Sequence, residues 1–391
     1  MKKLIITTII LVSVFSAFAY PLDMNGTPFN SLEKAFIPTD ASFSNYITYA
    51  LFKDPTVIGE GKFCVVFPSV SLTHYNTASF LSTEAGAKFA SRILKLQLDN
   101  LNWIPALYAE ASSLGVGYND LATLDLGFGV SDTNWVLGVN SRFLLDCYSP
   151  SGAGTDGQFR PQADLAASFA FNVNLLDRDN LSMDFAIVTR FAYRTYTTSD
   201  IELSVVQDFD FDSIGFTAGW AVPIDVALGF SILDDLIGIT ASVTNINGIY
   251  YTMDYDNFKK SITMQDGSNS DTLETPVEVN LLLEYDPKLK YVDPKLRIEL
   301  TDLYRLSERL LIDDPYEEIM AHVNAIVSLD VLGLVDLSVG LNAGYWQFES
   351  AFDVAGNSIS LLYGWHEAST QLGYKPVDSL TLRVTLGYDG N

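Results

Sequence analysis

The chain has 391 residues, with 23 basic and 48 acidic side chains and a formal net charge of −25. This acidic balance argues against a nucleic-acid-binding protein, which needs clustered lysine and arginine to neutralise phosphates. The only cysteines, Cys64 and Cys147, provide neither a disulfide framework nor a zinc pattern, and leave two free thiols or a single bridge as alternatives.

Residues 1–19 have the pattern of a cleaved secretory signal. Lys2 and Lys3 precede a short apolar stretch, and Ala17-Phe18-Ala19 has the small-residue spacing of a cleavage site. We predict a mature chain that begins at Tyr20. Its formal net charge would be −27, because removal of Lys2 and Lys3 takes two positive charges from the full chain, whose net charge is −25. The apolar stretch is shorter than the roughly 20 residues that a membrane-spanning helix needs.

Residues 20–120 are predicted to form an N-terminal segment with one strand and a partly helical portion. The strand is expected at residues 61–75. Between residues 79 and 116, apolar side chains such as Leu81 and Ala85 recur at the helical spacing i, i+4. In a barrel this portion would act as a plug, a lid or an interfacial helix. In a soluble protein it would instead pack against a sheet.

From residue 121 to the C-terminus, apolar and polar residues alternate with the period of two that is expected of β-strands. The clearest stretch runs from Ala163 to Leu175. We expect residues 214–232 to form two strands with a turn near Pro223, and residues 250–275 to form a long polar loop. The other predicted strands are 121–130, 135–145, 163–175, 181–194, 237–245, 277–285, 296–302, 319–329, 335–345, 359–365 and 380–388.

These patterns indicate an all-β protein, a transmembrane antiparallel β-barrel of about fourteen strands within a range of about 12–16, with residues 121–391 forming most of the wall. Many of the strands reach the 9–11 residues that a tilted strand needs to cross hydrocarbon. Aromatic residues near strand ends, including Trp135 and Trp365, fit interfacial girdles. The alternative is a soluble β-sandwich, whose apolar face would cover a core.

Charged residues on the polar face of the predicted strands are candidates to face the lumen, where they would pair and set the field of a pore. They are Arg142, Asp164, Asp184, Arg190 and Arg194.

Three carboxylates at alternate positions, Asp208, Asp210 and Asp212, form a weak candidate calcium site, because Ca²⁺ prefers several oxygen ligands. A solvated strand end is the alternative. The three histidines, His74, His322 and His366, lie far apart without metal spacing, and no catalytic motif is present. We therefore predict neither an enzyme nor a cofactor.

Several segments resemble the outer-membrane barrels related to the FadL long-chain fatty-acid transporter, the TraF-like proteins and PorV. Trp220–Gly248 is similar to their strand, short turn, strand and asparagine-containing loop, and Ala321–Val327 with Leu341–Trp346 is similar to their late hairpin. Asn102–Tyr118 resembles the N-terminal part of uncharacterised members. The resemblance implies a barrel with an N-terminal segment inside it. The Asn-Pro-Ala sequence near the mature start of FadL transporters is absent, so no ligand-binding residue is carried over.

The predicted function is passive passage of a small solute across the bacterial outer membrane, with hydrophobic solutes among the candidates. The expected partners are outer-membrane lipid, the solute, and the barrel-assembly machinery, which would read the alternating strand Leu380–Tyr388 near the C-terminus. A structural or secretion-accessory barrel without a conducting lumen is the first alternative. A soluble exported all-β binding protein is the second.

Overall fold

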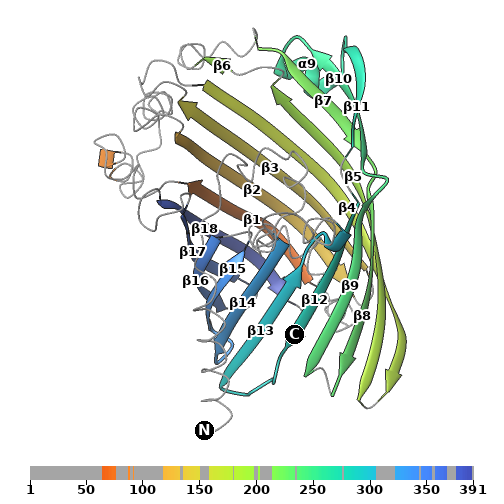
Figure 1. Cartoon of the computed structure of the whole chain (residues 1–391), viewed down its shortest axis with the longest axis vertical. Coiled ribbons are helices and arrows are strands. Elements are labelled where there is room, and N and C mark those ends of the chain that lie inside the picture. Colours follow the sequence, from red (N-terminus) through yellow and green to blue (C-terminus); the bar gives the residue numbers. More distant parts are fainter. Residues whose placement is uncertain are drawn as a thin grey trace, which may run out of the picture.

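The computed structural model describes residues 64–75, 118–132, 135–149, 158–178, 180–197, 201–202, 214–233, 236–274, 277–304, 322–342, 345–354, 357–367 and 376–389, together with Ala87, Lys88 and Ser91. The strands within these ranges form one antiparallel sheet that closes on itself, because β1 pairs with both β2 and β18 (Figure 1). The predicted signal peptide lies outside them. Of the predicted helical portion 79–116, only Ala87, Lys88 and Ser91 are described as helical.

The described elements are strands, apart from one short helix, α9. They are β1 (Cys64–Tyr75), β2 (Tyr118–Asp132), β3 (Trp135–Ser149), β4 (Gln158–Arg178), β5 (Leu181–Thr197), β6 (Ile201–Glu202), β7 (Phe216–Ala221), β8 (Ile224–Ile232), β9 (Ile237–Ile246), β10 (Ile249–Tyr255), α9 (Phe258–Thr263), β11 (Ser268–Glu274), β12 (Glu278–Tyr285), β13 (Val292–Leu300), β14 (Val323–Val331), β15 (Val335–Asn342), β16 (Tyr345–Val354), β17 (Asn357–Glu367) and β18 (Pro376–Asp389).

The described wall contains fourteen strands once each interrupted strand is counted as one. Strands β7 and β8 both pair with β5 and form one interrupted strand. Strands β9 and β10 form the next one, which pairs with β8 and β7, and β12 and β11 form a third, which pairs with β9 and β10. The two-residue β6 pairs only with the end of β4 and stands outside the ring. This closed antiparallel ring confirms the predicted fold class and the predicted number of strands.

The predicted turn near Pro223 is wrong. Ala192 lies opposite Ala221 and Thr189 lies opposite Ile224, so the register with β5 continues unchanged through the interruption. Proline has no backbone N–H to donate and therefore removes one ladder hydrogen bond. Its carbonyl still accepts from the Arg190 N–H at 3.0 Å, and the chain stays extended.

Two further expectations about the strands need correction. Residues 250–275 are not a polar loop but contain β10, α9 and β11. Strand β11 reads Ser-Asn-Ser-Asp-Thr-Leu-Glu and is almost fully exposed, so it has no apolar face to reveal it. Strand β16 was also missed: only two residues separate it from β15, and its outward residues Phe348 and Phe352 shift by one position from the alternation of β15.

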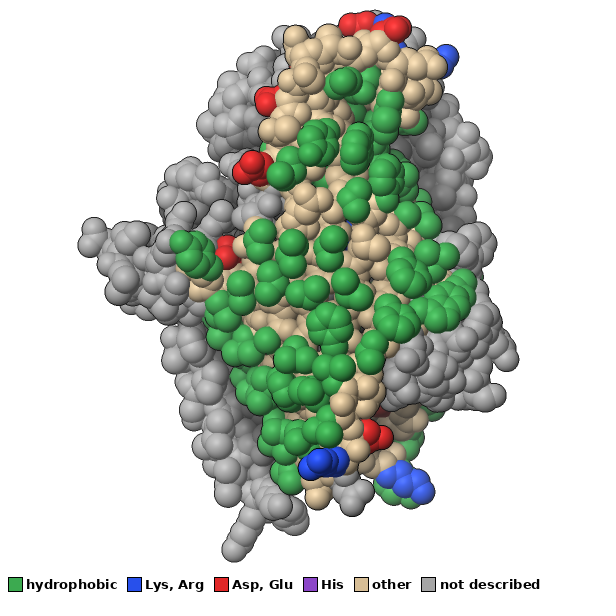
Figure 2. Space-filling view, turned by 90° about the vertical axis from the view of Figure 1, so that its right-hand side faces the viewer, with side chains coloured by type: hydrophobic (Ala, Val, Ile, Leu, Met, Phe, Trp, Pro, Cys, Tyr) green, Lys and Arg blue, Asp and Glu red, His purple; other side chains and the backbone are tan. Residues whose placement is uncertain are grey.

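The outer face of the sheet is apolar and the inner face is small or polar. Along β5, exposed Phe185, Ile187 and Phe191 alternate with buried residues such as Ala186 and Arg190. Figure 2 shows apolar side chains over most of the described part of one face, with Lys and Arg side chains at its top and bottom and acidic side chains at the ends and along its left edge. No helix among the described residues has the length and hydropathy to cross a membrane. Exposed apolar residues around a ring without free edges are what a strand-built membrane protein requires.

The two ends of the barrel differ in the length of their connections. At one end, the turns after β2, β4, β8, β12, β14 and β16 have two to six residues. At the other end, only the connection between β15 and β16 is that short, and the remaining ones have eight residues or more. In outer-membrane barrels the short turns face the periplasm and the long loops face outward.

The alternative of a Cys64–Cys147 disulfide is excluded by the register. Cys64 lies opposite Ser131 of β2, whereas Cys147 lies opposite Asp120 of the same strand. Those two positions are eleven residues apart along β2, about 36 Å at the usual rise of a strand. A disulfide needs Cα atoms within about 7 Å of each other.

Candidate functional site

The candidate site is the inner wall where the paths of β7–β8 and β9–β10 are both interrupted. From Val226 to Trp220 the first path uses six residue steps, while the facing path from Val243 to Tyr251 uses eight. The two additional residues form a bulge, in which Asn245 and Asn247 adopt φ values of 60° and 61°. Asparagine tolerates this left-handed region better than most residues, because its short side chain can hydrogen-bond locally.

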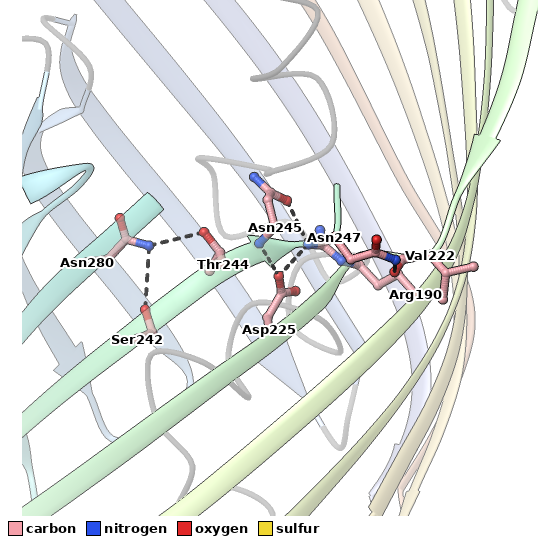
Figure 3. A network of polar contacts seen from close by, with 8 residues as sticks. All are labelled: Arg190, Val222, Asp225, Ser242, Thr244, Asn245, Asn247 and Asn280. Carbon is pink, nitrogen blue, oxygen red and sulfur yellow. Dashed lines mark hydrogen bonds and ion pairs between the residues drawn. The ribbon is translucent and has the colours of Figure 1, made fainter. Parts of the chain in front are cut away.

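Asp225 holds this bulge together (Figure 3). Its Oδ1 accepts the backbone N–H of Asn245 at 2.7 Å and Nη2 of Arg190 at 2.7 Å. The same guanidinium donates to Oδ1 of Asn245 at 3.0 Å. The backbone of Asn245 has no register partner on β8, so the carboxylate replaces the missing ladder acceptor. Arg190 and Asp225 are 6% and 1% exposed, and their ion pair links β5 to β8.

A second buried ion pair lies four residues further along the same face of β5, at Arg194. Arg194 donates from Nε to Oδ1 of Asp164 at 3.0 Å, and Gln162 donates to the other carboxylate oxygen at 2.8 Å. The Arg194 guanidinium also lies over the ring of Tyr250, 5.3 Å from its centroid. Together these contacts join β4, β5 and β10 along the inner face of the wall.

The structure places four of the five candidate lumen residues on the buried inner face. Asp164, Arg190 and Arg194 take part in the two ion pairs, and Asp184 accepts from Asn174 Nδ2 at 3.1 Å. The backbone of Arg142 lies opposite Asp164, which itself lies opposite Arg194. The candidate calcium residues Asp208, Asp210 and Asp212 lie outside the described residues. Within the described ranges, no group of three acidic, histidine or cysteine side chains is placed to hold a metal ion.

Sequence reasoning missed the polar residues that face the same interior from other strands. Asn280 donates to Ser242 and Thr244, and its Oδ1 accepts the backbone N–H of Asp302 at 3.0 Å. Asp225 carried a usable signal, since it is the one charged residue within the alternating run Phe216–Ile232. The partners of Asn280 could not be identified, because they depend on which strands become neighbours.

This part of the inner wall neutralises its own charge. The guanidinium groups of Arg190 and Arg194 each meet a carboxylate, and all four side chains are nearly inaccessible. The other inward residues of β5, β7 and β8 are mostly small and apolar, namely Ala186, Val188, Ala192, Ala221 and Ala227. The described inner surface of β5, β7 and β8 therefore combines small apolar residues with two buried ion pairs and the buried carboxylate of Asp184.

No protein-family model and no curated relative matches the chain. Similar solved structures include the toluene transporter TodX of Pseudomonas putida, with 10% identity, 88% of this chain and 93% of that chain covered, and a TM-score of 0.39. The toluene transporter TbuX of Ralstonia pickettii has 8% identity, with 88% of this chain and 93% of that chain covered and a TM-score of 0.41. A FadL homologue of Pseudomonas aeruginosa has 9% identity, with 96% of this chain and 99% of that chain covered and a TM-score of 0.39. Because these identities and TM-scores are low, the assignment of a closed barrel is based on the strand pairing of this chain itself.

Proposed function

We propose that this protein is an outer-membrane barrel through which a small, uncharged and hydrophobic solute passes passively. The observation that carries the proposal is the closed ring of fourteen strands with an exposed apolar outer face and an enclosed inner face. The short turns at one end and the long connections at the other fit the orientation of outer-membrane barrels.

The inner wall favours an uncharged solute over an ion. A pore that selects ions presents rings of charged side chains or carbonyl groups to the permeating ion. Here Arg190 with Asp225 and Arg194 with Asp164 form two buried ion pairs, and small apolar residues lie between them. The named cargo of the similar solved barrels, toluene, provides the first compound to test.

Uptake of radiolabelled toluene into vesicles that contain the refolded full chain tests the proposal. Tyr250 faces the interior and its neighbour Tyr251 faces outward, so Tyr250→Ala and Tyr251→Ala form a matched pair. We expect the wild-type protein to accelerate uptake, the inner substitution to change the rate several-fold and the outer substitution to leave it nearly unchanged.

Planar-bilayer recordings separate this function from an ion-conducting porin and from a structural barrel. Correctly inserted protein that accelerates uptake of neither toluene nor a labelled fatty acid, and that forms no channels, would support the non-conducting alternative. Large sustained conductance without toluene uptake would instead indicate a general porin.

A further inference from the structure

The short helix α9 lies on the outside of the barrel. Tyr193 Oη donates to the backbone carbonyl of Ser261 at 2.5 Å, and Thr195 Oγ1 donates to Ser261 Oγ at 3.2 Å. The rings of Phe216 and Phe258 are 5.2 Å apart. Tyr193 and Thr195 alternate along β5 with the inward-facing Arg194, so the helix covers the outer face of the wall.

The connection from β10 to β11 is held firmly in this position. Asn257 caps the helix by accepting the N–H of Lys260 at 2.9 Å, and Met264 ends it in the left-handed conformation. A Cβ atom added to Gly267 would lie 2.9 Å from Met253 Sδ, so the returning chain lies directly against β10. Met253 is two residues from the outward-facing Tyr251, which places residues 256–267 on the outer surface as a whole.

The height of this connection follows from β5. Leu181 and Phe191 are the ends of a run of outward positions that spans ten residue steps and is apolar except at Thr189. At the usual strand rise and a tilt of about 40°, ten steps cover about 25 Å along the barrel axis, which is the height of a lipid-facing apolar band. Phe191 therefore lies at the upper edge of that band, and Tyr193, which contacts α9, lies just above it.

A row of aromatic residues marks the same boundary. The ring of Phe191 stacks against that of Trp220 at 6.2 Å, and the ring of Trp220 lies 5.3 Å from that of Tyr251. Amphipathic aromatic rings concentrate at the boundary between acyl chains and headgroups. Beside this row, the α9 connection exposes Ile262 and Met264, whose exposed fractions are 54% and 48%.

We infer that residues 256–267 form a collar at the membrane surface, in which Ile262 and Met264 touch the headgroup layer of the bilayer while Asp266 faces water. The occupant is lipid because the exposed apolar surface is continuous with the aromatic row and the apolar band below it. This inference rests on the membrane placement in the proposed function, but not on passage of any solute.

Depth-dependent fluorescence quenching tests the collar. Ile262→Cys and Met264→Cys are each introduced into the full chain with Cys64→Ser and Cys147→Ser, labelled with a thiol-reactive fluorophore and folded into phosphatidylcholine vesicles. The vesicles carry a spin label on the headgroup or deep in the acyl chain. Ile187→Cys serves as the mid-band reference, and Asp266→Cys, whose side chain is 80% exposed within the same connection, serves as the water reference.

We expect labels at 262 and 264 to be quenched more by the headgroup spin label than by the deep one, the label at 187 to show the reverse order, and the label at 266 to be quenched by neither. Quenching at both 262 and 264 that matches position 266, while position 187 remains quenched, would overturn the collar alone. Absence of quenching at 187 would overturn the membrane placement itself. Heat-modifiable gel mobility verifies folding of each labelled protein before measurement.

Discussion

Individual charged residues of the inner wall act where the hydrogen-bond ladder is interrupted. Asp225 accepts from both Arg190 and the backbone of Asn245 at the bulge between β8 and β9. A buried guanidinium without its carboxylate leaves an uncompensated charge, which costs far more than the loss of an exposed ion pair. The contribution of Asp225 should therefore be large and local.

We expect Asp225→Ala to lower the free energy of unfolding by about 3–5 kcal/mol in vesicle-based urea titrations. The matched control is Asp256→Ala, which removes an exposed pair with Lys260 and should cost far less than the loss of the buried pair. Replacing both buried partners, with Arg190→Leu added to Asp225→Ala, should recover part of the loss. Equal effects of the two single substitutions would contradict this role of Asp225.

Two glycines of the inner wall provide a second contrast between single residues. A Cβ at Gly219 would lie 2.6 Å from the carbonyl oxygen of Tyr251 and 2.6 Å from Thr252 Cγ2, whereas a Cβ at Gly238 would meet nothing closer than 3.5 Å. We expect Gly219→Ala to destabilise the barrel by about 1–3 kcal/mol through overpacking. Gly238→Ala should be within about 1 kcal/mol of neutral, or stabilising. Thermal or urea unfolding would measure both, and a neutral Gly219→Ala would mean that β7 and β10 can separate locally.

At the scale of the elements, interruptions that look similar in the sequence differ in their consequences. Pro223 interrupts the path of β7–β8 but leaves its register with β5 unchanged. The break around Asn247 adds residues to one strand, changes the register with its neighbour and requires left-handed backbone conformations. The stability of the barrel should therefore depend on which residue type occupies position 247.

We expect Asn247→Gly to be tolerated, because glycine adopts positive φ without steric cost, and Asn247→Val to lose about 1–2 kcal/mol, because a β-branched residue is strained there. The side chain of Asn247 is exposed and donates only one hydrogen bond, to the carbonyl of Val222 at 3.2 Å. Both variants lose that bond, so the difference between them isolates the backbone term. Equal stability of the two in urea unfolding would argue against a rigid bulge.

The predicted elements show how far a period-two pattern can be followed. The count of fourteen was correct because two errors cancelled: the run through Pro223 was divided into two strands, and β16 was not recognised. The faces of β4 and β5 could be predicted, since alternation alone determines them. The partners of Asp164 and Arg190 could not be predicted, because they depend on the register between strands whose contacting residues are 30 to 55 apart in sequence.

At the scale of the whole molecule, the surrounding solvent decides which face of the sheet is stable outside. In water, a ring of exposed Phe, Leu and Ile side chains would be unfavourable, whereas acyl chains accept it. The charge that the chain carries, −25 in total, must then be placed at the two ends and in the interior. On the face in Figure 2, the centre of the described surface is apolar, and the charged side chains lie at its top, its bottom and its left edge.

A pair of outward substitutions on β5 tests this placement. Ile187 lies near the middle of the apolar run and Leu181 lies at its lower end, and both side chains are exposed to a similar degree. In a bilayer, Ile187→Arg should cost about 2–4 kcal/mol and Leu181→Arg only about 0–1 kcal/mol, because the cost of a charge depends on its depth. Urea titrations in phosphatidylcholine vesicles measure both. In a soluble globule the two arginines would face water equally, so equal small effects would show that the outer face does not meet lipid.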